Sequence, residues 1–575
     1  MNRNGVPCRR SAHCHTMRRD GLTLAIYVCI SFVYFGVPIA AHPGRDLIGK
    51  GPDPTVLVWA LAWWPYAILH WQNPIVTHAI WAPIGQNLAW APSVPGLALL
   101  AAPVTLIAGP AVSYNLLAIA LPACSAWTSY LLCRYLTHAF WPSIAGGYLF
   151  GFSAYELGQT EGHMQITSVF LVPLVALVVL RFLDGSFSAR RTMLTLGVLL
   201  ALQLSFAAEV ELTLTLTLAV ALVVAFAVVP SGRGRLRGLL PPLAGAYALA
   251  GLLTSPLLVY FFLRFQRGGV NSPRHFPADL ANLVIPTPLT WAGWHWTDLI
   301  SSRFVGNNAE NGAYLGLPCI AIVAWYVWSK RRAPTARFLA LMLAFGLVLE
   351  LGFRLHVAGR SYVSLPWSEV GDLPLLNSML PVRYSMFVAL GVAVSVACWA
   401  AAGSGPRFAR ALLPGLAVVA IAPSLWNSVW HEHPSRPAFF SSGRYEKCLL
   451  PDENVLALPF PNWSDAMLWQ AESNFSFRLA DGYISIVPTG LPDYAYADRI
   501  AKTNDPGADW RPVVKLARDQ RVTMILVAGR HSARWKTLLA PVATPAEIGG
   551  VSLYSLRSNG HSACTGGQVP DRRAA

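Results

Sequence analysis

Charged side chains are scarce in this chain, and acidic ones are the scarcest. Of its 575 residues, 28 are Asp or Glu and 43 are Lys or Arg. The charged share is 12%, whereas roughly a quarter of the residues in a soluble domain are charged. Hydrophobic residues supply 54%, and the mean hydropathy is +0.45. This composition excludes an ordinary water-soluble globular protein and predicts an integral membrane protein.

The sequence also lacks the patterns of several functional classes. Its nine cysteines show no metal-binding spacing; five lie within or at the ends of apolar segments, whereas Cys448 and Cys564 lie outside these and could pair. The basic residues behind the net charge of +15 are scattered over short loops, which speaks against a nucleic-acid partner and for contacts with membrane lipids. No inverted repeat, which many transporters carry, is visible.

Apolar segments of about 20 residues, long enough to cross a bilayer as helices, recur as far as Trp426. The expected fold is that of an α-helical polytopic membrane protein with about eleven transmembrane helices. The expected spans are residues 21–41, 113–133, 142–155, 165–183, 193–207, 212–229, 240–262, 313–328, 338–352, 384–402 and 412–426.

Short basic loops set the expected orientation, because such loops stay in the cytoplasm during membrane insertion. These loops are 134–138, 190–191, 233–237, 330–337 and 407–410, and five arginines precede the first span. They share one side only if segment 96–109 does not cross the membrane. We therefore expect 96–109 and the Trp-rich segment 55–71 to be interfacial helices, since Trp favours headgroup depth. The alternative is that 96–109 is an ordinary span.

The composition changes after Trp426, where polar residues and prolines replace the long apolar runs. Fragments 454–459 and 522–527 are typical of strands and 510–521 of a helix, which predicts an α/β domain with a buried parallel strand pair. The expected parts are a basic cytoplasmic N-terminus (1–20), a membrane domain (21–426) with a large first outer loop (42–112), and an extracytoplasmic domain (427–575). An odd number of spans places that last domain outside.

Asp53 is the leading catalytic candidate among the polar residues of the outer face. It lies in Gly51-Pro52-Asp53-Pro54, just before an aromatic-rich helix at the membrane surface. A carboxylate held there can serve as a general base or as a metal ligand. The alternative is that Asp53 only caps the helix that begins near Thr55, because Asp and Pro are common at helix starts.

Further carboxylates lie in the next two outer loops. Glu156, Glu161 and His163 fall within eight positions of each other and offer acid, base or metal-binding groups. The alternative is an ordinary hydrated loop. Glu209 stands at the end of a span, where a carboxylate needs water, a partner or a cavity.

Arg383 stands at the mouth of a span, in Leu380-Pro381-Val382-Arg383-Tyr384. Its planar guanidinium matches the oxygens of a phosphate, so we expect it to contact a phosphate group. The alternative is that the side chain extends to the lipid headgroups without a specific partner.

These features together resemble a known superfamily. The resemblance rests on Asp53, the two interfacial segments, Trp81-Ala82-Pro83-Ile84-Gly85, Glu156, His163, Glu310 before Tyr314-Leu315-Gly316, and Pro381-Val382-Arg383. The chain resembles the GT-C superfamily of membrane glycosyltransferases that use polyprenyl-phosphate sugars, in a bacterial branch.

The resemblance implies an inverting hexosyl- or pentosyltransferase of the bacterial inner membrane. It would move a sugar from a polyprenyl-phosphate carrier to a glycan, lipid or protein acceptor on the extracytoplasmic side. Asp53 would be the leading catalytic residue and act as a base, with Glu156, Glu161 and His163 assisting, and substrate would contact Asp46, Glu209, Glu310, Tyr314 and Arg383.

Metal use is less clearly implied, although a divalent cation is possible. The first loop has Pro52-Asp53-Pro54 where the best-known members have paired acids, and Asp46 is seven residues away. The competing function is a transporter or a flippase for lipid-linked sugars, with Glu209, Glu211 and His163 as a relay. That function predicts polar residues at the middle of the bilayer, whereas the candidates here concentrate at one face.

Overall fold

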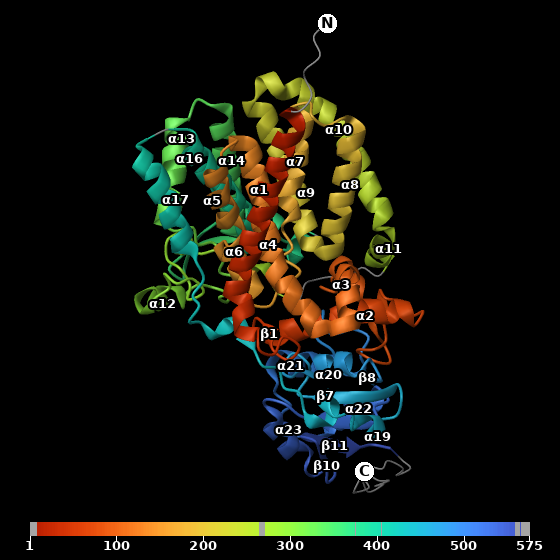
Figure 1. Ribbon diagram of the computed structural model, residues 1–575. Coiled ribbons are helices and arrows are strands. Elements are labelled where there is room, and N and C mark those ends of the chain that lie inside the picture. The colour runs from red at the N-terminus through yellow and green to blue at the C-terminus, as the bar shows by residue number, and fades with distance from the viewer. Residues whose placement is uncertain (1–7, 264–270, 374, 404, 558–563, 565–575) are drawn as a thin grey trace. The chain divides into compact units, whose positions relative to one another are not determined.

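The computed structural model describes residues 8–263, 271–373, 375–403, 405–557 and 564 (Figure 1). Residues 1–7 of the expected basic N-terminus lie outside the described residues. The chain divides into two compact units. The helical unit comprises Met1–Ala40, Leu116–Ser255 and Arg267–Trp430, and the sheet unit comprises Ala41–Asn115, Pro256–Gln266 and His431–Ala575. The first outer loop therefore belongs with the C-terminal part of the chain.

Each of the eleven expected spans coincides with helix. The helices are α1 (Cys8–Ser31), α4 (Pro110–Thr137), α5 (Phe140–Gly151), α7 (Leu171–Leu183), α8 (Ala189–Phe206), α9 (Ala208–Val228), α10 (Arg233–Leu253) with α11 (Ser255–Leu263), α13 (Leu317–Ser329), α14 (Pro334–Glu350), α16 (Ser385–Ala401) and α17 (Arg407–Ile421). Helix is the expected form, because in lipid a segment must satisfy its own backbone groups. Among the described residues, five helices are long and apolar enough to cross a membrane, so the number of spans stays a prediction.

Small residues allow helices α4, α5 and α16 to approach closely within the helical unit. A Cβ atom on Gly151 of α5 would lie 2.3 Å from the backbone nitrogen of Ala126 on α4. A Cβ atom on Gly146 would lie 2.7 Å from Sγ of Cys133 and 3.1 Å from the carbonyl oxygen of Ala393 on α16. Glycine at these positions is therefore required for the packing, as is common where membrane helices meet.

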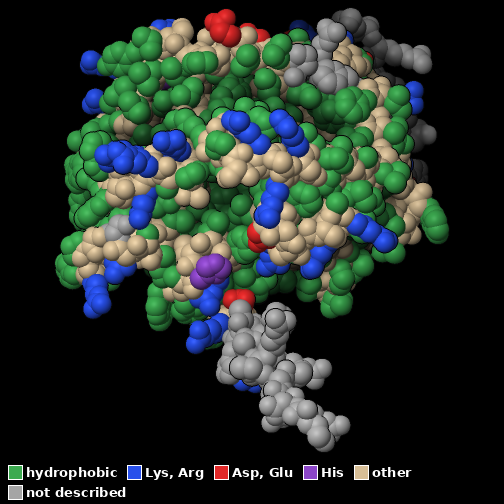
Figure 2. Space-filling view, turned by 90° about the horizontal axis from the view of Figure 1, so that it is seen from above, with side chains coloured by type: hydrophobic (Ala, Val, Ile, Leu, Met, Phe, Trp, Pro, Cys, Tyr) green, Lys and Arg blue, Asp and Glu red, His purple; other side chains and the backbone are tan. Residues whose placement is uncertain are grey.

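One end of the helical unit carries the basic loops. Arg19 and Arg134 both lie over the ring of Phe140, at 6.0 and 5.6 Å, and Arg235 donates a hydrogen bond of 2.5 Å to the carbonyl of Leu183. The end of α4 and the starts of α5 and α10 therefore lie on one side, as the orientation predicts. Viewed from this end, Lys and Arg side chains are spread over the surface and acidic ones are few (Figure 2).

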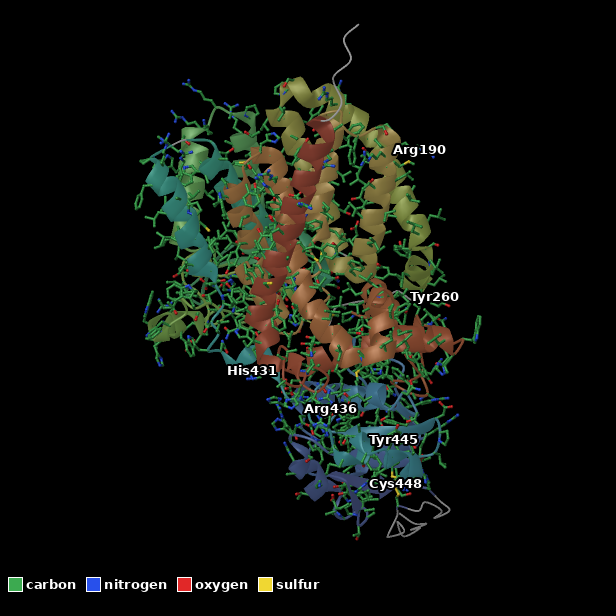
Figure 3. All side chains as sticks on the ribbon, in the orientation of Figure 1. Arg190, Tyr260, His431, Arg436, Tyr445 and Cys448 are labelled. Atoms are coloured by element: carbon green, nitrogen blue, oxygen red, sulfur yellow. A yellow bond between two sulfur atoms is a disulfide. The ribbon has the colours of Figure 1, made fainter. Side chains whose placement is uncertain are left out.

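The sheet unit contains a five-stranded mixed sheet in the order β10-β11-β9-β7-β8. Its strands are β7 (Glu453–Leu458), β8 (Phe477–Leu479), β9 (Met524–Val527), β10 (Ala546–Ile548) and β11 (Val551–Ser555). Strands β7 and β9 run parallel, with Val455 opposite Met524, and are buried, which confirms the predicted parallel pair. Helix α22 (Arg511–Asp519) fills the predicted helical segment. Cys448 and Cys564 form a disulfide (Figure 3).

Helices α2 (Pro52–Leu69) and α3 (Pro95–Ala108) of the first outer loop lie in the sheet unit. Trp59, Trp63 and Trp64 of α2 are buried in protein, and the interfacial placement of this helix stays a prediction. Trp59 donates a 2.7 Å hydrogen bond to Oε1 of Gln470 on α20 (Ala466–Glu472). The rings therefore belong to the core of the sheet unit. Helix α3 differs, because it keeps exposed apolar side chains such as Leu100 and Ile107.

Candidate functional site

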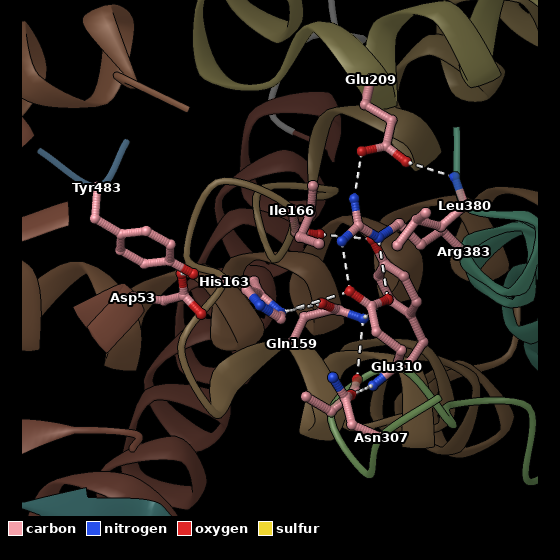
Figure 4. A network of polar contacts seen from close by, with 12 residues as sticks. Asp53, Gln159, His163, Ile166, Glu209, Asn307, Glu310, Leu380, Arg383 and Tyr483 are labelled. Atoms are coloured by element: carbon pink, nitrogen blue, oxygen red, sulfur yellow. Dashed lines mark hydrogen bonds and ion pairs between the residues drawn. The ribbon is translucent and has the colours of Figure 1, made fainter. Parts of the chain in front are cut away.

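Arg383 is the centre of a buried polar cluster in the helical unit (Figure 4). Its Nε donates to Oε2 of Glu310 at 3.0 Å, and its Nη2 donates to Oε1 of the same carboxylate at 2.5 Å. Its Nη1 forms an ion pair with Glu209, whose other oxygen accepts from the backbone N–H of Leu380 at 3.4 Å. One guanidinium thus joins three segments that are far apart in the sequence.

Each partner of this cluster comes from the end of an element. Arg383 lies in a short 3-10 turn, η8 (Pro381–Tyr384), that leads into α16, and Glu209 lies in the first turn of α9. Glu310 lies in the segment between α12 (His295–Ser301) and α13, where its backbone N–H donates to Oδ1 of Asn307 at 2.9 Å. Helix starts carry positive partial charge, so the carboxylate of Glu209 is well placed for its own helix.

Helix α6 (Ala154–Thr160) adds Gln159 and, just after the helix, His163. Gln159 Nε2 donates to the carbonyl of Ala309 at 3.1 Å and to Glu310 Oε2 at 3.3 Å. Nδ1 of His163 lies 2.8 Å from Oε1 of Gln159 and 3.8 Å from Oε1 of Glu310. The sequence reasoning missed Gln159, although its position four residues before His163 would have placed both side chains on one helical face.

The electrostatics around Glu310 favour its ionised carboxylate. Burial raises the pKa of Glu310, but the Arg383 guanidinium and His163 lower it by more, so the pKa lies below its ordinary value. Both edges of the guanidinium are occupied by carboxylates, with 13% of the Arg383 side chain exposed. Glu310 and Glu209 thus occupy the guanidinium of Arg383 in this structure, and its contact with a phosphate stays a prediction.

The remaining candidates of the helical unit lie outside these contacts. Glu156 is 1% exposed on α6, and burial raises its pKa well above the ordinary value, an effect that the Ser125 hydroxyl opposes. Glu161 ends α6 as its C-cap residue. Tyr314 is buried beside the start of α13, with 7% of its surface exposed. The segment expected to be a loop around Glu156 is therefore a helix that buries this carboxyl group.

Asp53 belongs to the sheet unit, in the first turn of α2. The N-cap residue of this helix is Gly51, at φ 89°, so the helix starts earlier than the capping alternative assumed. Asp53 is partly exposed, and its Oδ1 accepts a 3.3 Å hydrogen bond from the hydroxyl of Tyr483. Burial and the neighbouring Asp53 raise the pKa of Tyr483, which therefore remains a donor at neutral pH.

Asp46 holds the start of the first outer loop in place. It is 7% exposed, and its Oδ1 lies 2.5 Å from Nδ1 of His433. Beside it, strand β1 (Leu47–Ile48) pairs antiparallel with β6 (His431–Glu432), and the N–H of Gly51 donates to Glu432 at 2.6 Å. These contacts are all within the sheet unit. They join the segment before Asp53 to the segment that leads into the five-stranded sheet.

A metal ion finds no obvious set of ligands. Within the part of the chain that the structure describes, no three His, Cys, Asp or Glu side chains come together as a group that could hold a metal ion.

Comparisons with known proteins place these features in context. The model of a family described as a domain of unknown function (DUF6311) matches residues 24–422. No curated protein matches the chain. The arabinofuranosyltransferase AftD from Mycobacteria is similar in structure, with a TM-score of 0.60 and 14% identity over 95% of this chain and 40% of that one. This chain thus spans less than half the length of AftD.

Two further solved structures are similar to this chain. The oligosaccharyltransferase from Archaeoglobus fulgidus gives a TM-score of 0.53 at 13% identity, over 88% of this chain and 69% of that one. ArnT from Cupriavidus metallidurans, bound to undecaprenyl phosphate, gives 0.50 at 14% identity, over 95% of this chain and 99% of that one. At such identities the likeness concerns the fold, which is that of the GT-C glycosyltransferases, as the sequence features indicated.

Proposed function

We propose, from the premise that this chain belongs to the DUF6311 family and has the GT-C fold, that it is a membrane glycosyltransferase. In the proposed reaction a sugar passes from a polyprenyl-phosphate carrier to an acceptor on the extracytoplasmic side. The fold supports a donor of this kind, since apolar helices can keep a lipid tail in the bilayer while its head group reaches water. ArnT was solved with such a lipid phosphate bound.

The observation that carries this proposal is the placement of Asp53. Its carboxylate stands at the start of α2 in the first outer loop, is partly exposed and accepts a hydrogen bond from Tyr483. In the proposed step Asp53 takes the proton of an acceptor hydroxyl, whose oxygen forms a bond to the anomeric carbon. The bond from that carbon to the phosphate oxygen breaks, and the phosphate leaves on its lipid with the bonding electrons. Such a general base contributes typically 10² to 10⁴-fold.

The Arg383 cluster has a different proposed role. Because its carboxylates already neutralise the guanidinium, Arg383, Glu209 and Glu310 act as positioning residues that hold the outer loops of the helical unit together. Glu209 and His163 keep 23% and 19% of their side chains exposed, and His163 is the one proposed to meet substrate, because an imidazole can accept or donate a proton. Asp46 keeps a positioning role for the loop that carries Asp53. Glu156 and Glu161 keep the assisting roles that the resemblance implies, and Tyr314 keeps its role in substrate contact.

The proposed location is the bacterial inner membrane, with the basic loops in the cytoplasm and the five-stranded sheet outside. Two observations support it. The loops rich in Lys and Arg gather at one end of the helical unit, as cytoplasmic loops do. The Cys448–Cys564 disulfide suits an oxidising compartment, because cytoplasmic thiols are kept reduced. The proposed division into a membrane domain and an extracytoplasmic α/β domain follows from the same argument.

The experiment is a transfer assay in membrane vesicles that contain the protein. Radiolabelled polyprenyl-phosphate sugars are offered as a panel, and incorporation into endogenous material is measured for wild type and Asp53→Asn. The matched control is Asp298→Asn, which changes an exposed Asp in the first turn of α12. We expect label to be incorporated by wild type and by the control, and to be lost in Asp53→Asn.

Two outcomes would count against the proposal. Full transfer in Asp53→Asn would remove Asp53 as the catalytic base. The absence of transfer with every donor, from wild type that is inserted and folded, would favour the transporter or flippase alternative, which flux of the same labelled lipids across the vesicle membrane would then measure.

A further inference from the structure

The sheet unit contains a cavity of about 500 Å³ that is separate from the surroundings of Asp53. All of its lining residues belong to that unit and come from α2 and the segment after it, from α11, and from residues 452–478. The volume lies in the range of small-molecule sites. We infer that this cavity binds carbohydrate, and that it holds the uncharged, non-reacting part of an oligosaccharide acceptor.

Aromatic rings form one wall of the cavity. The ring of Phe475 lies 4.6 Å from that of Tyr66 and 5.3 Å from that of Trp63, measured between centroids. Trp63 and Phe475 are buried, whereas Tyr66 is partly exposed. Rigid aromatic faces of this kind offer apolar area at little entropic cost, and the faces of sugar rings that carry only C–H groups are complementary to them.

Amide and hydroxyl groups lie beside that wall. Asn73 accepts from the N–H groups of Ile75 and Val76 at 2.9 and 3.2 Å, which fixes its side chain, and its Nδ2 donates to Tyr260 Oη at 2.7 Å (Figure 3 labels Tyr260). The hydroxyl of Tyr260 therefore accepts from Asn73 and keeps its own proton to donate. Gln72 adds an exposed amide that can both donate and accept. Planar, oriented groups of this kind match sugar hydroxyls.

The charges of the lining indicate an uncharged ligand. Asp452 and Arg478 are the residues of the lining that are charged at pH 7, and they pair at 3.3 Å. Their charges cancel, so the cavity has no excess positive charge with which to hold the phosphate of a lipid carrier. Nδ1 of His78 lies 3.1 Å from the carbonyl of Pro83, which can only accept, so Nδ1 donates to it.

The position of the cavity along α2 indicates which part of the acceptor it would take. Trp63 lies ten residues after Asp53 on the same helix, a rise of about 15 Å. A single sugar ring cannot occupy the cavity and reach Asp53, so an acceptor that does both is an oligosaccharide. Binding of such remote parts is a known means of orienting the reacting group. The acceptor assignment rests on the proposed function, whereas carbohydrate binding does not.

The test is direct binding to the full-length protein in lipid nanodiscs. The probes are soluble linear gluco-, manno-, galacto- and arabino-oligosaccharides of two to six residues, measured by calorimetry and saturation-transfer NMR. We expect one of these series to bind wild type and Asp53→Asn equally, with inorganic phosphate failing to compete. Tyr66→Ala should weaken binding about tenfold through the lost ring contact. Gln72→Ala, an exposed change with little risk to folding, should weaken it about threefold.

The matched control is Trp71→Ala, because Trp71 is 97% exposed, adjoins Gln72 and does not line the cavity. It should leave binding unchanged. Any of three results would overturn the inference: wild type binds none of the four series, binding is unchanged in both Tyr66→Ala and Gln72→Ala, or inorganic phosphate displaces the bound oligosaccharide. Binding that follows the expected pattern in a protein without transfer activity would reject the proposed function and leave the carbohydrate site standing.

Discussion

Two carboxylate sites, one in each unit, use the same chemical group in opposite ways. In the helical unit Glu310 is 3% exposed and accepts hydrogen bonds from both Nε and Nη2 of Arg383. In the sheet unit Asp53 is partly exposed and accepts from a tyrosine hydroxyl at 3.3 Å. The first carboxylate is enclosed with a permanent cation, whereas the second remains within reach of solvent.

The difference separates structural from chemical roles. A buried ion pair is costly to break, because removing one partner leaves the other charged in a poor environment. Each charged group of such a pair is therefore stabilised in place by the other. The carboxylate of Asp53 keeps partial access to solvent, and a general base needs such access to reach the hydroxyl of a bound molecule. The predictions below test this contrast between the two sites, beginning with the largest effect.

The first prediction concerns Asp53. Asp53→Asn should lower the rate of sugar transfer by about 10³-fold, because the amide cannot take up the proton of the acceptor hydroxyl. Its thermal unfolding should stay close to that of wild type. The transfer rate and thermal unfolding are measured on the same preparation. If Asp53→Asn lowers both, the loss of transfer would reflect unfolding and would not show a chemical role for Asp53.

The second prediction reverses this pattern at Arg383. Arg383→Met should reduce the free energy of unfolding by about 3–5 kcal/mol, because Glu310 and Glu209 lose their cation inside the protein. The control is Arg274→Met, whose pair with Asp372 is exposed and should be worth at most about 1 kcal/mol. Denaturation in mixed detergent measures both. Equal effects of the two substitutions would show that the Arg383 cluster does not hold the helical unit together.

A third carboxylate, that of Asp465 in the sheet unit, should make the stability of the protein depend on pH. Burial raises the pKa of Asp465 to about 6, against an ordinary 3.8, although the N–H of Ser435 donates to it. The folded state holds this proton more tightly than the unfolded state, so the free energy of unfolding should fall as pH rises from about 4 to 6, by about 3 kcal/mol. Asp465→Asn should remove this fall in thermal unfolding scans. The control Asp298→Asn should show the same fall in stability as wild type. Loss of the fall in this control would mean that another group than Asp465 causes it.

The smallest predicted effect is that of Tyr483→Phe. The substitution removes the hydroxyl that donates to Asp53 while keeping the ring, so transfer should slow about fivefold. Tyr362→Phe serves as the control, because Tyr362 is 51% exposed in the helical unit and the transfer rate of this variant should equal that of wild type. A rate for Tyr483→Phe equal to wild type would mean that the hydrogen bond does not orient Asp53.

The sequence by itself determined the class of the protein and the positions of its elements. Hydropathy located helices at all eleven expected segments, and short apolar fragments identified the parallel pair β7–β9. Both patterns are local, because burial in lipid or in a sheet core is recorded residue by residue. The GT-C resemblance followed from residues in the outer loops, which the similar folds of AftD and ArnT bear out.

Only the tertiary structure decided which side chains meet. Glu209 and Arg383 are 174 positions apart, and nothing local in either segment indicates that they pair. The tryptophans of α2 correctly indicated an aromatic helix, but the residues that bury them, such as Gln470, come from the far end of the chain and could not be foreseen. Such contacts form only when segments that are distant in the sequence fold together, so the pattern of one segment alone cannot predict them.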